Sequence, residues 1–142
     1  MPKENLRVLL VEDHPFQMVA TQSLLNSYGF HHLTPAANAA EALRAMEAVH
    51  TPFDLLLCDQ CLPDIPGLEL IHAASQRGKI RQAILLSSLS LEELRILNQT
   101  ALSRHIPLLA CLSKPLNGLV LENVLGTNQV SGGTRTSCRK NT

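Results

Sequence analysis

The sequence has no excess of charge of either sign. Its 142 residues carry 12 Lys and Arg side chains against 12 Asp and Glu side chains, so the formal net charge is zero. Proteins that bind nucleic acid or anionic membranes by electrostatic attraction generally carry a positive excess. The composition therefore gives no reason to expect direct nucleic acid binding by this chain.

Long hydrophobic runs are also missing. No apolar run approaches the ~20 residues that a transmembrane helix needs. The N-terminal stretch, MPKENLRVLLVED, meets charge too early for the apolar region of a signal peptide. We therefore expect a cytoplasmic protein that does not span a membrane.

The one short cysteine motif lacks the partners that a metal or redox site would need. Cys58 and Cys61 have the CxxC spacing, but a structural zinc site needs a second ligand pair at suitable spacing. Thioredoxin-like motifs usually open a helix, whereas Cys58 ends an apolar run that is typical of a strand. In a cytoplasmic protein the thiols are expected to be reduced. We assign Cys58 to core packing, and His14 and the His31-His32 pair to the surface.

What the sequence does contain is a regular alternation of two patterns. Five apolar runs typical of buried strands alternate with five segments of helical periodicity. The strands are expected at residues 6–11, 31–35, 53–58, 83–86 and 108–112, and the helices at 15–28, 39–49, 68–77, 91–104 and 116–125. This order predicts an α/β fold, a doubly wound five-stranded parallel sheet with helices on both faces.

A change of composition near Gly126 suggests a domain boundary. Residues 1–125 are expected to form one domain, since domains commonly contain ~100–150 residues. Beyond them the chain is rich in Gly, Ser, Thr, Asn and basic residues. Such a segment has too few apolar groups to offset the entropy of ordering. Residues 126–142 are therefore expected to be a flexible tail or linker.

Polar side chains follow four of the predicted strands. Glu12 and Asp13 follow the first strand, Asp59 the third, Ser87 the fourth and Lys114 the fifth. The carboxyl ends of parallel strands share one edge of the sheet, where ligands bind, so these side chains should lie close together. Three neighbouring carboxylates repel one another unless a cation intervenes, and carboxylate and carbonyl oxygens suit Mg²⁺.

This set of residue types indicates a particular chemistry. A bound Mg²⁺ with a spare position attracts a phosphoryl group, and Lys114 adds positive charge for the same oxygens. Ser87 offers a hydroxyl donor. Asp59 stands at the end of a rigid strand and is the expected nucleophile. Together they predict a site for phosphoryl transfer to an aspartate.

Four short motifs extend this reading to a known family. They are VEDHP at residues 11–15, DQCLPDIPG at 59–67, LLSS at 85–88 and SKP at 113–115. In this order, and in this strand context, they resemble the receiver domain of two-component response regulators. The resemblance runs from Leu6 to about Leu125 and implies the flavodoxin-like receiver fold.

The resemblance implies roles for the acids. Asp59 would accept a phosphoryl group in a Mg²⁺-dependent reaction and the domain would then switch conformation. Asp13 would bind the metal directly, together with Asp59 and the backbone carbonyl of Cys61. Glu12 would orient a metal-bound water. The donor implied is a sensor histidine kinase or a histidine phosphotransfer protein, and the chain itself would be a signalling module, not an enzyme.

The remaining motif positions match the family at Ser87 and Lys114 and depart from it at Cys111. The resemblance implies that Ser87 is the switching hydroxyl, that Lys114 pairs with the phosphate and that the bond between Lys114 and Pro115 is cis. Receivers commonly have an aromatic residue three positions before this lysine, and here that residue is Cys111. A small thiol cannot act as the aromatic switch, so we expect any coupling to pass through Ser87 and the segment 88–90.

The last predicted helix is apolar on nearly every side. A helix that packs one face on a sheet needs only part of this apolar surface. We therefore expect Leu121 or Leu125 to be exposed and to contact a second chain or a further domain, because exposed apolar patches usually mark contacts. The alternative is that the tail buries this helix. The resemblance implies a homodimer, or a partner contact, through the face made by the fourth and fifth helices.

Two other function classes compete with this one. Hydrolases of the haloacid-dehalogenase type also use a strand-end aspartate with Mg²⁺, but they need a second acid two residues later, where this chain has Cys61. The other alternative is a receiver-shaped interaction module that is never phosphorylated. The complete set of acids, hydroxyl and lysine argues against it, and binding of a phosphate analogue would decide.

Overall fold

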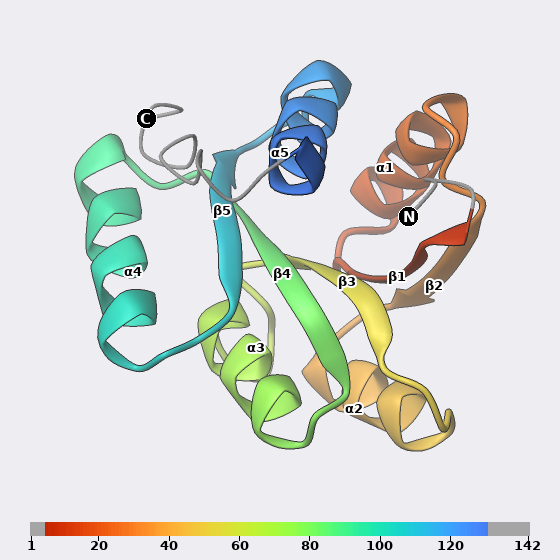
Figure 1. Ribbon diagram of the computed structural model, residues 1–142, viewed down its shortest axis with the longest axis horizontal. Coiled ribbons are helices and arrows are strands. Elements are labelled where there is room, and N and C mark those ends of the chain that lie inside the picture. The colour runs from red at the N-terminus through yellow and green to blue at the C-terminus, as the bar shows by residue number, and fades with distance from the viewer. Residues whose placement is uncertain (1–4, 131–142) are drawn as a thin grey trace.

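The computed structural model describes residues 5–130 of the chain, and their side chains up to residue 126. Five strands and five helices alternate along it (Figure 1). The strands are β1 (Arg7–Val11), β2 (His32–Ala36), β3 (Phe53–Asp59), β4 (Ile80–Ser87) and β5 (Leu108–Ser113). The helices are α1 (Pro15–Ser27), α2 (Ala39–Glu47), α3 (Gly67–Gln76), α4 (Leu91–Ser103) and α5 (Gly118–Val130).

The strands form one parallel sheet in the order β2-β1-β3-β4-β5. The helices α1 and α5 cover one face, and α2, α3 and α4 cover the other (Figure 1). This arrangement is the flavodoxin-like receiver fold, so the predicted fold class is confirmed. None of the described helices is long and apolar enough to cross a membrane.

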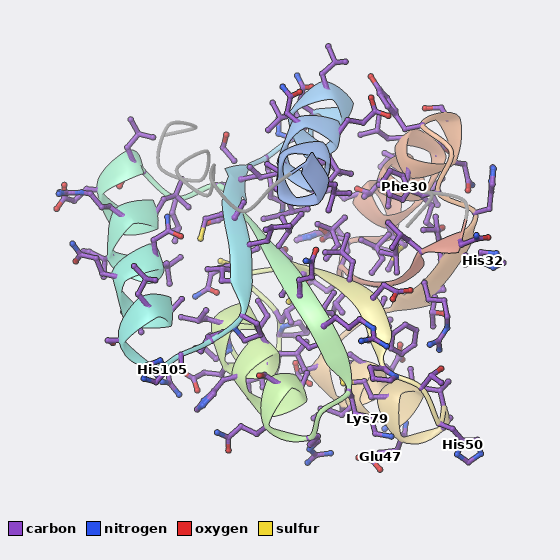
Figure 2. All side chains as sticks on the ribbon, viewed as in Figure 1. Phe30, His32, Glu47, His50, Lys79 and His105 are labelled. Carbon is purple, nitrogen blue, oxygen red and sulfur yellow. The ribbon has the colours of Figure 1, made fainter. Side chains whose placement is uncertain are left out.

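Side-chain alternation along the strands produces two separate cores. On β3, Leu55 and Leu57 belong to the core under α1 and α5, whereas Leu56 and Cys58 belong to the core under the other three helices. All four are fully buried, as continuous apolar strands of parallel sheets require. Phe30, labelled in Figure 2, is fully buried in the first core. Buried packing on both faces holds the carboxyl end of β3 firmly.

Two helices begin with caps that their residue types, Asn38 and Ser90, favour from the sequence alone. The Asn38 side chain accepts a hydrogen bond from the Glu41 backbone N–H at 2.8 Å and so begins α2. Ser90 and Glu93 form a complete capping box at the start of α4. The Glu41 side chain instead accepts from the N–H of Ala37, one residue before the helix cap, so the second pair is only partly a capping box.

The largest differences from the predicted bounds are in β4 and α5. The strand β4 begins at Ile80, not at residue 83, because its polar first residues also pair with β3 and Arg81 lies 3.4 Å from Asp54. Helix α5 begins at Gly118, where Asn117 caps it by accepting from the N–H groups of Leu119 and Val120. It continues to Val130, past the predicted end at residue 125 and into the predicted tail, 126–142. The rest of that tail, 131–142, lies outside the described residues.

The prediction that Leu121 or Leu125 is exposed is wrong. Leu121 is 1% exposed, and Val124 and Leu125 are buried beside it. Their i, i+3, i+4 spacing forms one helix face, and that face packs on the sheet with α1. Among the described residues, the exposed large apolar side chain of α5 is Leu119. The predicted contact with a second copy stays a prediction, and its apolar residues would be Leu119 with Leu91, Ile96 and Leu102 of α4.

Candidate functional site

The strand register brings the predicted site residues to one edge of the sheet. Val11 of β1 pairs with Cys58 of β3, so Glu12 and Asp59 follow as neighbours. On the other side of β3, Ser87 of β4 pairs with Ser113 of β5, directly before Lys114. The carboxyl ends of β1, β3, β4 and β5 therefore form a single site, as predicted.

At the centre of the site one lysine pairs with two buried carboxylates. Asp59 is 2% exposed and Glu12 is 4% exposed. The Lys114 ammonium lies 3.1 Å from Asp59 Oδ2 and 3.7 Å from Glu12 Oε1. Buried charges are tolerated when they are paired, but one ammonium balances only one of the two carboxylates. The site keeps a negative charge that a cation would neutralise.

Asp13 adds a third carboxylate with an unused oxygen. Its Oδ1 is inaccessible to solvent and accepts no hydrogen bond within the described part of the chain. The His14 ring lies beside it, with Nδ1 at 3.2 Å from Asp13 Oδ1. A buried carboxylate oxygen without a donor is costly, unless it binds a ligand. Oxygens of Glu12, Asp13 and Asp59, with a ring nitrogen of His14, all lie within 4.8 Å of one another. The carboxylate oxygens suit a hard divalent cation such as Mg²⁺.

The segment 60–66 behind Asp59 is fixed to two helices. Asp64 accepts hydrogen bonds from the N–H groups of Ala39 and Ala40, both at 3.0 Å, and so joins the N-terminus of α2. Desolvation acts to raise the pKa of Asp64, but the backbone N–H donors outweigh it and the pKa is lowered. Gln60 holds the other end, because its side chain accepts from the N–H of Leu68 in α3.

Gly67 lets α3 approach β3 closely. Its N–H donates to the Gln60 carbonyl at 2.9 Å. A Cβ at this position would overlap the carbonyl oxygen of Asp59, the Cα of Gln60 and the Leu85 side chain. Only glycine permits this packing. The segment carries Cys61, whose N–H donates to Asp59 Oδ1 at 3.3 Å, so its anchoring also positions the Asp59 carboxylate.

The Ser87 hydroxyl contacts the segment 88–90, which follows it in the sequence. It is buried and accepts a hydrogen bond from the Leu89 N–H at 3.0 Å. Within the described residues no hydrogen bond joins it to Asp59. Its backbone carbonyl accepts from the Lys114 N–H at 2.9 Å, and the bond between Lys114 and Pro115 is cis, as expected. The structure therefore places the backbone of Ser87 beside that of Lys114, while the Ser87 hydroxyl is bonded to Leu89.

Two of the described cysteines, Cys58 and Cys111, are buried packing residues, whereas Cys61 is exposed. Burial, with the neighbouring charges of Asp59 and Glu12, raises the pKa of the Cys58 thiol well above its usual value, which disfavours the reactive thiolate. These three cysteines form no disulfide bond within the described residues. At the position of the missing aromatic residue, the buried Cys111 thiol donates to Asn98 of α4 at 3.5 Å. That contact links β5 to α4 without a side chain able to swing between two positions.

Sequence reasoning missed three contributors to the site. His14 was assigned to the surface, and although its ring is mostly exposed, its Nδ1 contacts both acids of the pair. Gln60 and Asp64 were not assigned roles. Both are polar residues shortly after Asp59, which could have pointed to a role. The spacing of residues along the sequence, however, does not predict that a side chain from a distant loop caps a helix. Cys61 is placed beside Asp59 through its N–H, and a metal-binding role for its carbonyl stays a prediction.

Two curated proteins share part of this sequence. The chain is 32% identical over 84 residues to the cyclic di-GMP phosphodiesterase RocR of Pseudomonas aeruginosa, covering 58% of this chain and 21% of the relative. It is 35% identical over 74 residues to the sensor protein TorS of Escherichia coli K12, covering 52% of this chain and 8% of the relative. The chain thus spans a small part of the length of these relatives.

The fold has solved counterparts, and the sequence matches one family along most of its length. The CheY chain from the CheX–CheY–BeF3–Mg²⁺ complex of Borrelia burgdorferi superposes with a TM-score of 0.71 at 19% identity, covering 89% of this chain and 90% of that chain. Residues 8–123 match the family described as the response regulator receiver domain. That match decides against a haloacid-dehalogenase hydrolase. The chain therefore belongs to the receiver domain family of two-component signalling.

Proposed function

We propose that Asp59 accepts a phosphoryl group in a Mg²⁺-dependent reaction and that this chain thereby acts as a response regulator receiver. The observation that carries the proposal is the pairing of the buried Asp59 carboxylate with Lys114 at 3.1 Å, beside the unused oxygen of Asp13. A carboxylate held in this way is aimed and partly desolvated. Both properties favour its use as a nucleophile.

Each residue of the site would have its own role in the phosphoryl transfer. An oxygen of Asp59 attacks the phosphorus of the donor, the new P–O bond forms, and the bond from phosphorus to the leaving group breaks. Lys114 already contacts Asp59 Oδ2 and would pair with a phosphoryl oxygen as charge develops there. Asp13, Asp59 and the Cys61 carbonyl would hold Mg²⁺, and Glu12 would orient its water. When bound, the ion neutralises the charge between the carboxylates and the phosphoryl oxygens.

Ser87 supports a conformational response. Its hydroxyl now accepts from Leu89 N–H but stands next to Lys114 in the sheet register. We propose that it turns to donate to a phosphoryl oxygen on Asp59, which releases the Leu89 N–H and shifts the segment 88–90 toward the site. Since Cys111 cannot supply an aromatic switch, this segment would carry the signal to α4.

The rim of the site offers a surface for the phosphodonor. Phe16 is 90% exposed and Val19 is also exposed, one turn apart on α1 directly after Asp13. A donor that delivers a phosphoryl group to Asp59 must cover this rim, and exposed apolar residues usually mark contacts. TorS, one of the relatives, is a sensor protein. We propose a cytoplasmic receiver, residues 1–125, that docks a sensor histidine kinase or a histidine phosphotransfer protein.

Phosphorylation by a small donor tests the proposal. The protein is incubated with acetyl phosphate, with and without Mg²⁺, and its intact mass is measured. We expect one phosphoryl adduct in the presence of Mg²⁺, and none in Asp59→Asn. Asp54→Asn is the matched control, because Asp54 lies on the same strand at the opposite end, and it should still react.

Two outcomes would count against this assignment. An adduct that persists in Asp59→Asn would place the acceptor elsewhere. A wild-type protein that gives no adduct and binds no beryllofluoride with Mg²⁺ would instead be a receiver-shaped interaction module, which is the remaining alternative.

A further inference from the structure

We propose that His14 supplies an imidazole ligand to the metal site, so that the site binds first-row transition ions such as Co²⁺ more tightly than its oxygens alone would. The inference rests on the proposed metal site and adds a residue and a metal preference to it. Its starting point is that one ring nitrogen faces both acids of the pair.

The spacing of the atoms matches that of ligands around one ion. His14 Nδ1 lies 3.1 Å from Glu12 Oε2 and 3.2 Å from Asp13 Oδ1. Ligands at about 2.0–2.2 Å from a metal, at tetrahedral or octahedral angles, are separated by about 2.8–3.6 Å. The ligand atoms of these residues and of Asp59 lie within 4.8 Å of one another. An ion between them therefore needs only small side-chain adjustments.

The backbone holds His14 in this position. Its N–H donates to Glu12 Oε2 at 3.1 Å, the same oxygen that its ring nitrogen approaches. His14 occupies the cap position of α1, but its side chain makes no capping hydrogen bond. The imidazole is therefore not needed by the helix. With the ring 59% exposed, Nε2 can face solvent while Nδ1 faces the metal site.

Imidazole changes which metals the site prefers. Mg²⁺ is bound by oxygen ligands, whereas Zn²⁺, Co²⁺, Ni²⁺ and Cu²⁺ also gain from a neutral imidazole nitrogen. A site with carboxylates and one histidine is thus able to hold Mg²⁺ through oxygens alone and a transition ion through oxygens and His14. If His14 only stabilised the acids by its position, its loss would affect both kinds of ion equally.

Metal titrations of three proteins test this assignment. Mg²⁺ and Co²⁺ are each titrated by calorimetry into the wild type, His14→Asn and His105→Asn, and the visible absorption of Co²⁺ is recorded. His105 is the matched control, since it is an exposed histidine beyond the end of α4 and before the amino end of β5, away from the site (Figure 2). Asn at residue 14 retains the backbone N–H and a polar side chain.

We expect His14→Asn to lower the Co²⁺ affinity at least about tenfold, the smaller of the losses seen when groups around a metal are removed. Its Mg²⁺ affinity should stay within about twofold and its Co²⁺ spectrum should change, while His105→Asn should match the wild type. Equal losses for both ions, unchanged Co²⁺ affinity or no Co²⁺ binding by the wild type would each overturn the inference. Intact Mg²⁺-dependent phosphorylation in such a case would leave the proposed function standing.

Discussion

The two loops that flank the acceptor are held in different ways. The segment 60–66 after β3 is fixed to other elements, through Asp64 to the N-terminus of α2 and through Gln60 to α3. The segment 88–90 after β4 is held mostly by neighbours in sequence. Ser87 accepts from Leu89, and Ser90 forms its capping box with Glu93.

This difference suggests a division between the acceptor side and the signalling side. Moving segment 60–66 would break several hydrogen bonds to separate helices at once, which keeps Asp59 and its surroundings in place. Moving segment 88–90 away from β4 requires the loss of the local hydrogen bond from Leu89 N–H to Ser87, worth about 0.5–1.5 kcal/mol, because the capping box of Ser90 joins the segment to α4. A new bond from Ser87 to a phosphoryl group is sufficient to offset that cost, since charged acceptors bond more strongly.

The largest effect should come from filling the space at Gly67. In Gly67→Ala the new methyl group overlaps the Asp59 carbonyl and Gln60 Cα, and backbone atoms cannot yield as a flexible side chain would. We expect the free energy of unfolding to fall by about 1–3 kcal/mol or more and phosphorylation to be strongly reduced. Denaturant unfolding and the acetyl phosphate assay measure both. The control is Gly126→Ala, where a Cβ meets no atom within 4 Å. Equal stability of the two variants would show that segment 60–66 is not tightly held.

A smaller effect is expected from releasing the same segment at Asp64. Asp64→Ala leaves the N–H groups of Ala39 and Ala40 without their acceptor. Because Asp64 is exposed, we expect a loss near the low end for helix caps, about 0.5–1 kcal/mol, together with weaker Mg²⁺ binding through a less ordered Cys61. Asp64→Asn keeps one acceptor oxygen, so its stability and its Mg²⁺ affinity should both lie between those of Asp64→Ala and the wild type. Mg²⁺ affinity equal to that of the wild type would mean that the anchor serves α2 alone.

The same residue gives a pH dependence. The folded-state pKa of Asp64 lies below its unfolded value, since the backbone donors outweigh desolvation. Its contribution is therefore complete above the unfolded pKa and is lost as the pH falls through the folded pKa. In denaturant unfolding at a series of acidic pH values, Asp64→Asn should lose less stability than the wild type over this range. If the free energies of unfolding of the two proteins fell in parallel with pH, Asp64 would make no such contribution.

The smallest effect on stability is expected on the signalling side. Ser87→Ala removes one local acceptor, that of the Leu89 N–H, so the free energy of unfolding should change by about 1 kcal/mol or less. Phosphorylation of Asp59 should persist, but the change in the amide spectra of residues 88–90 on adding beryllofluoride should disappear. Ser87→Thr keeps the hydroxyl and should retain that change. If Ser87→Ala responded to beryllofluoride as the wild type does, the movement of segment 88–90 would not depend on the Ser87 hydroxyl.

Most of the fold and the main residues of the site follow from the sequence. Apolar runs and helical spacing are local patterns, and they predicted all ten elements in the correct order. The parallel sheet then places every strand's carboxyl end at one edge. That is why Glu12, Asp13, Asp59 and Lys114 could be brought together before any coordinates were considered, as could the caps at Asn38 and Ser90.

Other features were decided only by the tertiary structure, because they depend on contacts between distant segments. A register shift after Ala83 leaves one extra residue on β5, so that Ser87 pairs with Ser113 and Lys114 follows beside it. The reach of Asp64 to α2 depends on the path of a whole loop. The orientation of α5 buries Leu121 and Leu125, whereas the apolar pattern alone predicted that one of them would be exposed. Sequence patterns fix which residues are apolar, polar or charged, whereas packing decides which of them meet.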